Sequence, residues 1–190
     1  MAHDTEEPEL DEDGLIIQRY DSVVLVVVPP AGYGDQILRY ARSSLYNVHV
    51  GTRSVSSVAD DLIKGRLQDE FMVDGSLAEA DMADYAGIVI AGSEGESPFA
   101  HDEKVLQLVR EAHADGKLIA TWGNALAVLA AAGVVKGRKV TGDPASEELV
   151  RRAGGKFTGR EIEVAKHIVT ARDEGAGMRF GQSLAEIVRI

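Results

Sequence analysis

Residues 119–142, IATWGNALAVLAAAGVVKGRKVTG, carry the clearest structural signal in this chain. An apolar strand runs into a tight turn, Thr121-Trp122-Gly123-Asn124, and an alanine-rich helix starts directly after it. The helix ends at Gly133, in keeping with the preference for glycine at helix ends. A strand that meets a helix in this way presents the residues of its turn at the mouth of a pocket. Here the turn offers a glycine and an asparagine, and the whole sequence contains no cysteine.

Strands and helices alternate along the rest of the chain. Continuous apolar runs such as SVVLVVVP are typical of strands buried on both faces of a parallel sheet. We predict a small hairpin within residues 60–80, which carry turns at Gly65 and Asp74-Gly75. The other predicted strands are 22–29, 47–55, 86–93, 117–121, 138–142 and 167–172, and the predicted helices are 34–45, 101–116, 124–133, 146–155 and 177–190. This order predicts an α/β fold with a mainly parallel sheet and helices on both faces.

Length and composition limit the class of protein. A chain of 190 residues suits one domain. Without cysteine there is no disulfide, no thiolate nucleophile and no cysteine-ligated metal. The longest apolar stretch is too short to span a bilayer, and no basic and apolar leader opens the sequence. We therefore expect a cytoplasmic protein with no membrane partner.

The net charge of −11 is unevenly distributed. Residues 1–14 hold seven acidic residues and neither lysine nor arginine, which leaves 24 acidic and 20 basic residues in the remainder. We interpret residues 1–18 as an acidic N-terminal tail and residues 19–190 as the folded domain. A docking arm for a basic partner is the alternative interpretation of the tail. No run of five to eight basic residues occurs, so we expect no nucleic-acid partner.

Candidate site residues follow the predicted parallel strands, because sites in such sheets lie at the carboxyl ends of the strands. The glycine-rich GYGDQI after the first strand does not complete a dinucleotide-binding fingerprint, since Ile37 replaces the third glycine and Asp35 would repel a pyrophosphate. The acidic residues of GSEGESP, in a surface loop, are best explained as solvated, and we predict no metal site. Arg172-Asp173-Glu174 predicts a salt-bridged rim. We expect no cofactor.

The segment from Lys117 to Thr141 resembles the ThiJ/PfpI superfamily, relatives of the class I glutamine amidotransferases. Members carry Lys-Pro-(apolar)-Ala, a nucleophile turn Cys-His-Gly-Pro, a helix ending Ala-Gly, and Lys-Gly-Arg-Lys-(apolar)-Thr. This chain has KLIATWGNAL, then Ala132-Gly133, then KGRKVT. AGS at 91–93 stands where the family has Pro-Gly-Gly, and residues 154–188 resemble its C-terminal segment. The resemblance implies a flavodoxin-like three-layer sandwich and a homodimer.

The resemblance also implies where the active site would lie. Gly123 occupies the position of the nucleophilic cysteine, and Asn124 that of the following histidine. Asp35 stands in for a glutamate that hydrogen-bonds the nucleophile. Gly92 and Ser93 occupy the loop that supplies an oxyanion-hole amide. Neither the nucleophile nor the base of the usual pair is present.

Three interpretations of this turn remain open. Glycine relieves the strained backbone of such a turn, so the site can be a relaxed vestige. Alternatively, a pocket built by Asp35, Gly92, Ser93, Trp122, Gly123 and Asn124 binds a small molecule without turnover. The third interpretation is an enzyme with another nucleophile, Ser93 or Thr121. Trp122 fits either the core or the pocket wall. We predict a noncatalytic protein that binds a small molecule or a protein partner; the alternative is a cysteine-independent hydrolase, lyase or hydratase acting on a small carbonyl compound through Asp35 and Ser93 or water.

Overall fold

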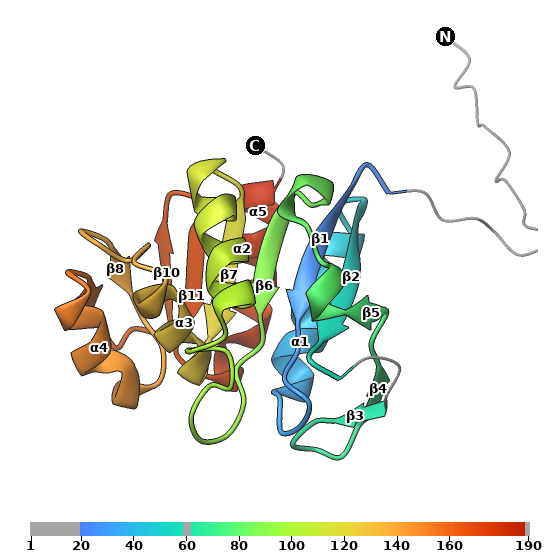
Figure 1. Ribbon diagram of the computed structural model, residues 1–190, viewed down its shortest axis with the longest axis horizontal. Helices are drawn as coiled ribbons and strands as arrows, with labels where there is room; N and C mark the ends of the chain where they lie inside the picture. The colour runs from blue at the N-terminus through green and yellow to red at the C-terminus, as the bar shows by residue number, and fades with distance from the viewer. Residues whose placement is uncertain (1–19, 59–61, 189–190) are drawn as a thin grey trace, which may run out of the picture.

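A seven-stranded sheet forms the middle layer of the protein, in the order β10-β11-β7-β6-β1-β2-β5 (Figure 1). The computed structural model describes residues 20–58 and 62–188. The strands are β10 (Ile162–Ala165), β11 (Ile168–Ala171), β7 (Leu118–Trp122), β6 (Gly87–Ile90), β1 (Ser22–Val27), β2 (Val50–Ser56) and β5 (Gly75–Ser76). The edge strand β10 runs antiparallel to β11, and all other neighbours are parallel. The predicted mainly parallel sheet is confirmed.

Helices cover both faces of this sheet, as predicted. The long helices are α1 (Asp35–Tyr46), α2 (Glu103–Ala114) and α5 (Gly177–Val188), and the short ones are α3 (Leu126–Ala131) and α4 (Glu147–Arg152). Helices α1 and α5 pack against each other on one face, and α2 and α3 lie on the other (Figure 1). Single turns of 3-10 helix complete the connections: η1 (Leu77–Glu79), η2 (Met82–Asp84), η3 (Gly123–Ala125), η4 (Pro144–Ser146) and η5 (Glu174–Ala176). The result is a flavodoxin-like three-layer sandwich.

The alternation of side chains along β1 shows how one strand serves both layers. Leu25 and Val27 pack into the hydrophobic cluster under α2 and α3. Val24 and Val26 point the other way, into the cluster under α1 and α5. A strand whose two faces are both buried has to be apolar throughout, which explains the valine-rich sequence.

Two small sheets lie outside the main one. The predicted hairpin within residues 60–80 is present as β3 (Leu62–Lys64) and β4 (Glu70–Met72), which pair antiparallel. The predicted strand 138–142 is shorter than expected, because β8 (Lys139–Val140) pairs with β9 (Lys156–Phe157) and not with the main sheet. Sequence analysis missed both β9 and β10. The acidic tail, residues 1–18, lies outside the described residues, as do the last two residues of the predicted closing helix.

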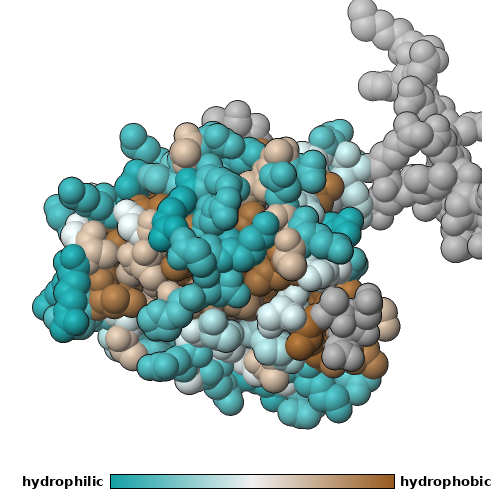
Figure 2. Space-filling model, in the orientation of Figure 1, coloured by the Kyte–Doolittle hydropathy of each residue, from teal (hydrophilic) through white to brown (hydrophobic). Residues whose placement is uncertain are grey.

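Hydrophilic side chains cover most of the face shown in Figure 2, with apolar patches between them. One apolar patch lies over the β3–β4 hairpin, where Leu62 and Met72 are more than half exposed, at 55% and 63%. None of the helices among the described residues has the length and apolar character needed to cross a membrane.

Candidate functional site

The junction between β7 and α3, which we call the elbow (residues 121–124), keeps a sharp strand-to-helix turn. Gly123 has a φ of +58°, a left-handed conformation that glycine adopts at little cost. A Cβ atom built on Gly123 would meet no atom within 4 Å, apart from its chain neighbours. The position normally given to a nucleophile therefore has both the unusual backbone and the free space that a side chain would need.

Two neighbouring glycines let other backbone segments approach the elbow closely. A Cβ on Gly92, in the loop after β6, would lie 2.8 Å from Cδ1 of Trp122. A Cβ on Gly142 would lie 2.7 Å from the carbonyl oxygen of Gly123. The N–H of Asp143 donates to that same carbonyl at 3.0 Å. Two segments thus hold the elbow from two sides, and a residue larger than glycine at position 92 or 142 would push its segment away from the elbow.

Asn124 ties the elbow to the loop after β6. Its side-chain oxygen accepts a hydrogen bond from the N–H of Ser93 at 2.9 Å. Its amide nitrogen donates to the carbonyl of Gly95 at 2.8 Å and to Oγ of Ser93 at 3.3 Å. The Ser93 amide, which would be a donor of the oxyanion hole, already has an acceptor within the protein. The loop is therefore fixed in place by the residue that follows Gly123.

A cavity of about 120 Å³ opens beside Gly123. Trp122, Gly123 and Asn124 of the elbow line it together with Gly92 and Ser93, and its rim is charged. The rim residues are Arg66, Asp143, Arg172, Asp173 and Glu174. Because cationic and anionic groups stand around one small opening, the cavity suits a compact polar ligand rather than a large apolar one.

Arg66 spans the mouth of this cavity from the turn between β3 and β4. Its Nε lies 3.0 Å from Glu94, in the loop after β6, and its Nη1 lies 2.8 Å from Glu174, after β11. Arg172 pairs with Asp173 at 2.7 Å, so the predicted salt-bridged rim is present. Exposed pairs of this kind contribute little stability, but they position the side chains around the opening.

The structure brings together most of the predicted site residues. Gly92, Ser93, Trp122, Gly123 and Asn124 all line the cavity at the elbow. Asp35 is the exception, because it lines a separate cavity with residues of α1 and β4. The predicted grouping of Asp35 with the elbow residues is thus not seen.

The environment of Asp35 explains its separation from the elbow. Asp35 is almost fully buried, and its Oδ2 accepts from the N–H of Leu67 at 2.8 Å. The carboxylate lies directly against Gly65, where a Cβ would collide with it. Both contacts direct Asp35 to the β3–β4 turn. The nearby ring of Tyr33 is buried, and burial first and the Asp35 carboxylate second raise the pKa of its hydroxyl.

The two alternative nucleophiles differ in position. Thr121 is fully buried within β7, and its hydroxyl has no hydrogen-bond partner among the described residues. Ser93 lines the cavity, but its Oγ receives the weak contact from Asn124 noted above. The indole of Trp122 packs edge-on against Phe180, with ring centroids 5.6 Å apart, and is 2% exposed. Trp122 thus serves mainly the core, and only its edge borders the cavity.

Sequence reasoning placed Glu174 on the predicted rim but missed Arg66 and Asp143 as neighbours of the elbow. Arg66 comes from a hairpin distant in sequence, and Asp143 from the loop that follows β8. No spacing along the chain links these residues. A signal was present only for Glu174, which follows the predicted strand 167–172, since the carboxyl ends of parallel strands share one edge.

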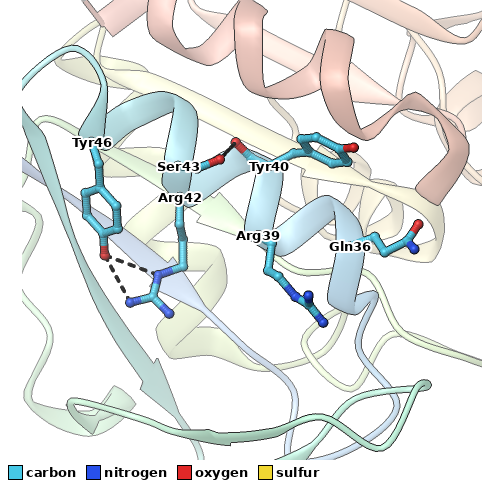
Figure 3. Close-up of a pocket in the computed structure, with 6 residues that line it drawn as sticks. All are labelled: Gln36, Arg39, Tyr40, Arg42, Ser43 and Tyr46. Carbon is cyan, nitrogen blue, oxygen red and sulfur yellow. Dashed lines mark hydrogen bonds between the residues drawn. The ribbon is translucent and has the colours of Figure 1, made fainter.

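A hollow of about 560 Å³ lies elsewhere, along the exposed side of α1 (Figure 3). Its residues mostly contact one another. Nε and Nη2 of Arg42 donate to the hydroxyl of Tyr46 at 3.3 and 3.0 Å, and its guanidinium lies 4.8 Å from the ring centre of Phe71. None of the predicted site residues lines this hollow. It is a surface feature apart from the elbow.

The protein is a mainly parallel α/β sandwich, and its elbow lies between two closely approaching glycine segments at the carboxyl edge of the sheet. This combination defines a DJ-1-like class of protein. The family model for the DJ-1/PfpI family matches residues 23–187. The chain belongs to the DJ-1/PfpI family. The predicted ThiJ/PfpI resemblance is confirmed.

Individual relatives agree with this assignment. An uncharacterised protein of Methanocaldococcus jannaschii is 26% identical over 168 residues, covering 87% of this chain and 82% of the relative. A protein named a deglycase, from Thermococcus kodakarensis, is 27% identical over 135 residues, covering 71% and 81%. Among solved structures, a ThiJ/PfpI domain protein of Brachyspira murdochii has a TM-score of 0.83 at 19% identity, covering 90% of this chain and 98% of that one. Drosophila melanogaster DJ-1beta has a TM-score of 0.78 at 22% identity, covering 88% and 90%.

Proposed function

We propose that this protein is a noncatalytic member of the DJ-1/PfpI family that binds a small molecule at the elbow. The observation that carries the proposal is the hydrogen bond from the Ser93 amide to Asn124, beside a nucleophile position occupied by glycine. The side chain that would attack a carbonyl is thus missing at position 123. The Ser93 amide, which would stabilise the oxyanion, is already hydrogen-bonded to Asn124. The cavity beside them is nevertheless open.

The energetic requirement supports a binding role. Enzymes lower their barriers by at least about 8 kcal/mol, whereas one oxyanion-hole donor supplies about 2.7–4 kcal/mol. Without a nucleophile at position 123, preorganised amides alone do not reach that figure. The deglycase activity in the name of the Thermococcus relative is therefore not proposed for this chain.

The cysteine-independent alternative requires Asp35 and Ser93 to act on one substrate. They line different cavities, and the carboxylate of Asp35 is engaged by the amide of Leu67. Because the two groups do not share a cavity, we do not propose this alternative.

The ligand proposed for the elbow cavity is small and polar. The cavity is well below the roughly 300–1,000 Å³ of sites for drug-sized ligands. Arg66 and Arg172 offer donors, and Asp143, Asp173 and Glu174 offer acceptors. A compact molecule with both a carbonyl or carboxyl group and a hydroxyl or amino group would match them.

A thermal-shift screen of small polar metabolites tests this proposal. A ligand at 100 times its dissociation constant adds about 2.7 kcal/mol of stability. Gly123→Leu would fill the open space, and Gly123→Ala is its control, because both variants carry the same backbone cost. A ligand that stabilises the wild type and Gly123→Ala but not Gly123→Leu binds at the elbow. If every stabilising ligand acts equally on both variants, the elbow is not the binding site.

The proposal also includes a homodimer, which rests on the family resemblance, and a cytoplasmic location, which rests on the lack of cysteine and hence of disulfides. Light scattering in dilute solution should give twice the mass of one chain. A mass equal to one chain would contradict the dimer without affecting the proposed binding at the elbow.

A further inference from the structure

Basic side chains without an acidic partner gather at one place in this acidic protein. Within residues 20–58 and 62–188, most lysines and arginines have a carboxylate within 4.0 Å. Five of those that lack such a partner lie together, and we call them the basic patch: Lys136, Arg138, Lys139, Lys156 and Lys166. They come from three separate segments that the fold brings to one end of the sheet.

All members of the basic patch except Lys156 line an open hollow of about 430 Å³. One wall is the segment 136–139, which leads into β8, and the other is the segment 163–166, which ends β10. Lys139 is paired in parallel register with Lys156 on β9. Figure 1 shows β8 and β10 at the end of the molecule away from β5. Lys166 precedes β11 and Arg172 follows it, so the hollow and the elbow cavity lie at opposite ends of that strand.

Arg138 is fixed rather than free within the basic patch. Its Nη1 donates to the carbonyls of Val134 and Lys136, at 3.0 and 3.2 Å. Its Nη2 lies 3.3 Å from Nε2 of His113, whose Nδ1 lies 2.9 Å from Nε2 of His167. The guanidinium of Arg138 carries a permanent positive charge. Protonation of either neighbouring imidazole would add a second positive charge near the hollow.

This arrangement has an uncompensated electrostatic cost. Like charges on directly opposite residues of neighbouring strands repel, as do Lys139 and Lys156. Glu163 is the acidic residue that lines the hollow, but it is 10% exposed and is paired with Arg160 at 3.7 Å. Lys166 lies in the turn that joins the edge strand β10 to β11, where a lysine can help to prevent unwanted strand pairing. That explanation does not extend to Arg138, whose guanidinium is held in place by carbonyl groups.

We propose that the basic patch is a binding site for a small molecule that bears phosphate groups. Lysine binds phosphate as a point charge, and several cations around one hollow match a group with two or more negative charges. Val164 and Ala165 form an apolar part of the wall, against which the organic part of such a ligand would rest. The site is independent of the elbow and of the function proposed for it.

Pyrophosphate is the probe that tests this site in the full-length protein. Its affinity is measured by thermal shift and by titration of the histidine signals in NMR spectra, with sodium chloride at equal ionic strength as the reference. We expect saturable binding that moves the signals of His113 and His167, and an affinity at least tenfold weaker in Lys139→Gln/Lys156→Gln. Lys104→Gln is the control, since it removes a single lysine outside the basic patch, on α2, and it should bind like the wild type.

The double variant should fold normally, because removing the Lys139–Lys156 repulsion leaves its unliganded melting temperature equal to or above that of the wild type. Equal affinity in the wild type and the double variant would overturn the proposal. A response to pyrophosphate no larger than the response to sodium chloride would overturn it as well.

Discussion

The side-chain oxygen of Asn124 accepts the backbone N–H of Ser93 at 2.9 Å, across the loop that faces the elbow. The family resemblance implies that the loop containing Ser93 would supply an amide to an oxyanion hole. Here one residue of the elbow holds that amide, and its neighbour Gly123 provides open space. The site thus combines an amide that already has an acceptor, and a glycine at the nucleophile position, with an open cavity.

Replacing Asn124 by alanine should destabilise the protein by about 1–3 kcal/mol, because the amide of Ser93 and the carbonyl of Gly95 lose their partners. Denaturant unfolding measures the change. Asn47→Ala is the matched control: Asn47 is exposed at the end of α1, and its replacement should change stability by less than about 0.5 kcal/mol. Equal effects of the two substitutions would mean that the Asn124 contacts do not hold the loop.

Gly123→Cys should give a reactive thiol and a less stable protein. The backbone at φ +58° should cost a non-glycine residue about 1–3 kcal/mol. The new thiol would sit at the amino end of η3 and α3, which favours the thiolate, so its pKa should fall below the free value of about 8.5. Alkylation rates between pH 6 and 9 measure that pKa.

Gly116→Cys is the control for this thiol. Gly116 also has a positive φ, +67°, and free space around it, but it follows the carboxyl end of α2. Its thiol should react no faster than free cysteine at pH 7. If the two variants reacted at the same rate, the elbow would lack the activating geometry that we assign to it.

The fold was predictable because its signals are local and repeated. The valine-rich β1 and the segment from β7 to β8 each carry a pattern that a parallel α/β sheet requires. The edge strand β10 was missed because its four residues, Ile162–Ala165, form an antiparallel hairpin with β11 through a turn at Lys166, φ +60°. Glycine or asparagine is the usual residue at such a turn, and a lysine at this position does not predict one.

The site was predictable only where chain proximity or family resemblance placed it. Gly92, Ser93 and Gly123 follow strands that end at one edge of the sheet, so their meeting could be foreseen. Asp35 also follows such a strand, but its carboxylate accepts the amide of Leu67, in a hairpin whose packing no local pattern specifies, and it lines another cavity. The basic patch escaped detection because its members lie on three segments and form no run in the sequence.

Stability should fall as the pH drops below about 6.5, through the pair formed by His113 and His167. Burial first lowers the pKa of both histidines, and the positive charge of Arg138 lowers both further. The folded state therefore binds fewer protons than the unfolded state between the lowered pKa values and the ordinary value of about 6.5. Above that pH window the two histidines make a constant contribution to the free energy of unfolding. Within the window, each step toward lower pH lowers the free energy of unfolding.

Melting temperatures recorded from pH 5 to pH 8 measure this dependence. The double variant His113→Gln/His167→Gln should show a flatter curve below pH 6.5 than the wild type. His101→Gln, which replaces an exposed histidine in the loop after β6, serves as the control. A double variant with the same acid sensitivity as the wild type would show that the pair does not cause it.

Removing residues 1–18 should leave the melting temperature nearly unchanged at moderate salt. The first 13 residues carry seven acidic residues and, apart from alanine, only Met1 and Leu10 as aliphatic side chains. The family match begins at residue 23, beyond this segment. A fall of more than a few degrees on truncation would show that the segment contributes to the fold or to an interface.

The most direct measurement of the central claim is turnover of a small carbonyl substrate by the wild-type protein. Proton NMR can follow methylglyoxal and its adduct with N-acetylarginine, beside a protein-free blank. We predict that the wild-type rate equals the blank, because Gly123 supplies no nucleophile and Asn124 occupies the Ser93 amide. Saturable turnover by the wild type that persists in Gly123→Ala and disappears in Gly123→Leu would contradict this account and establish the elbow as an active site.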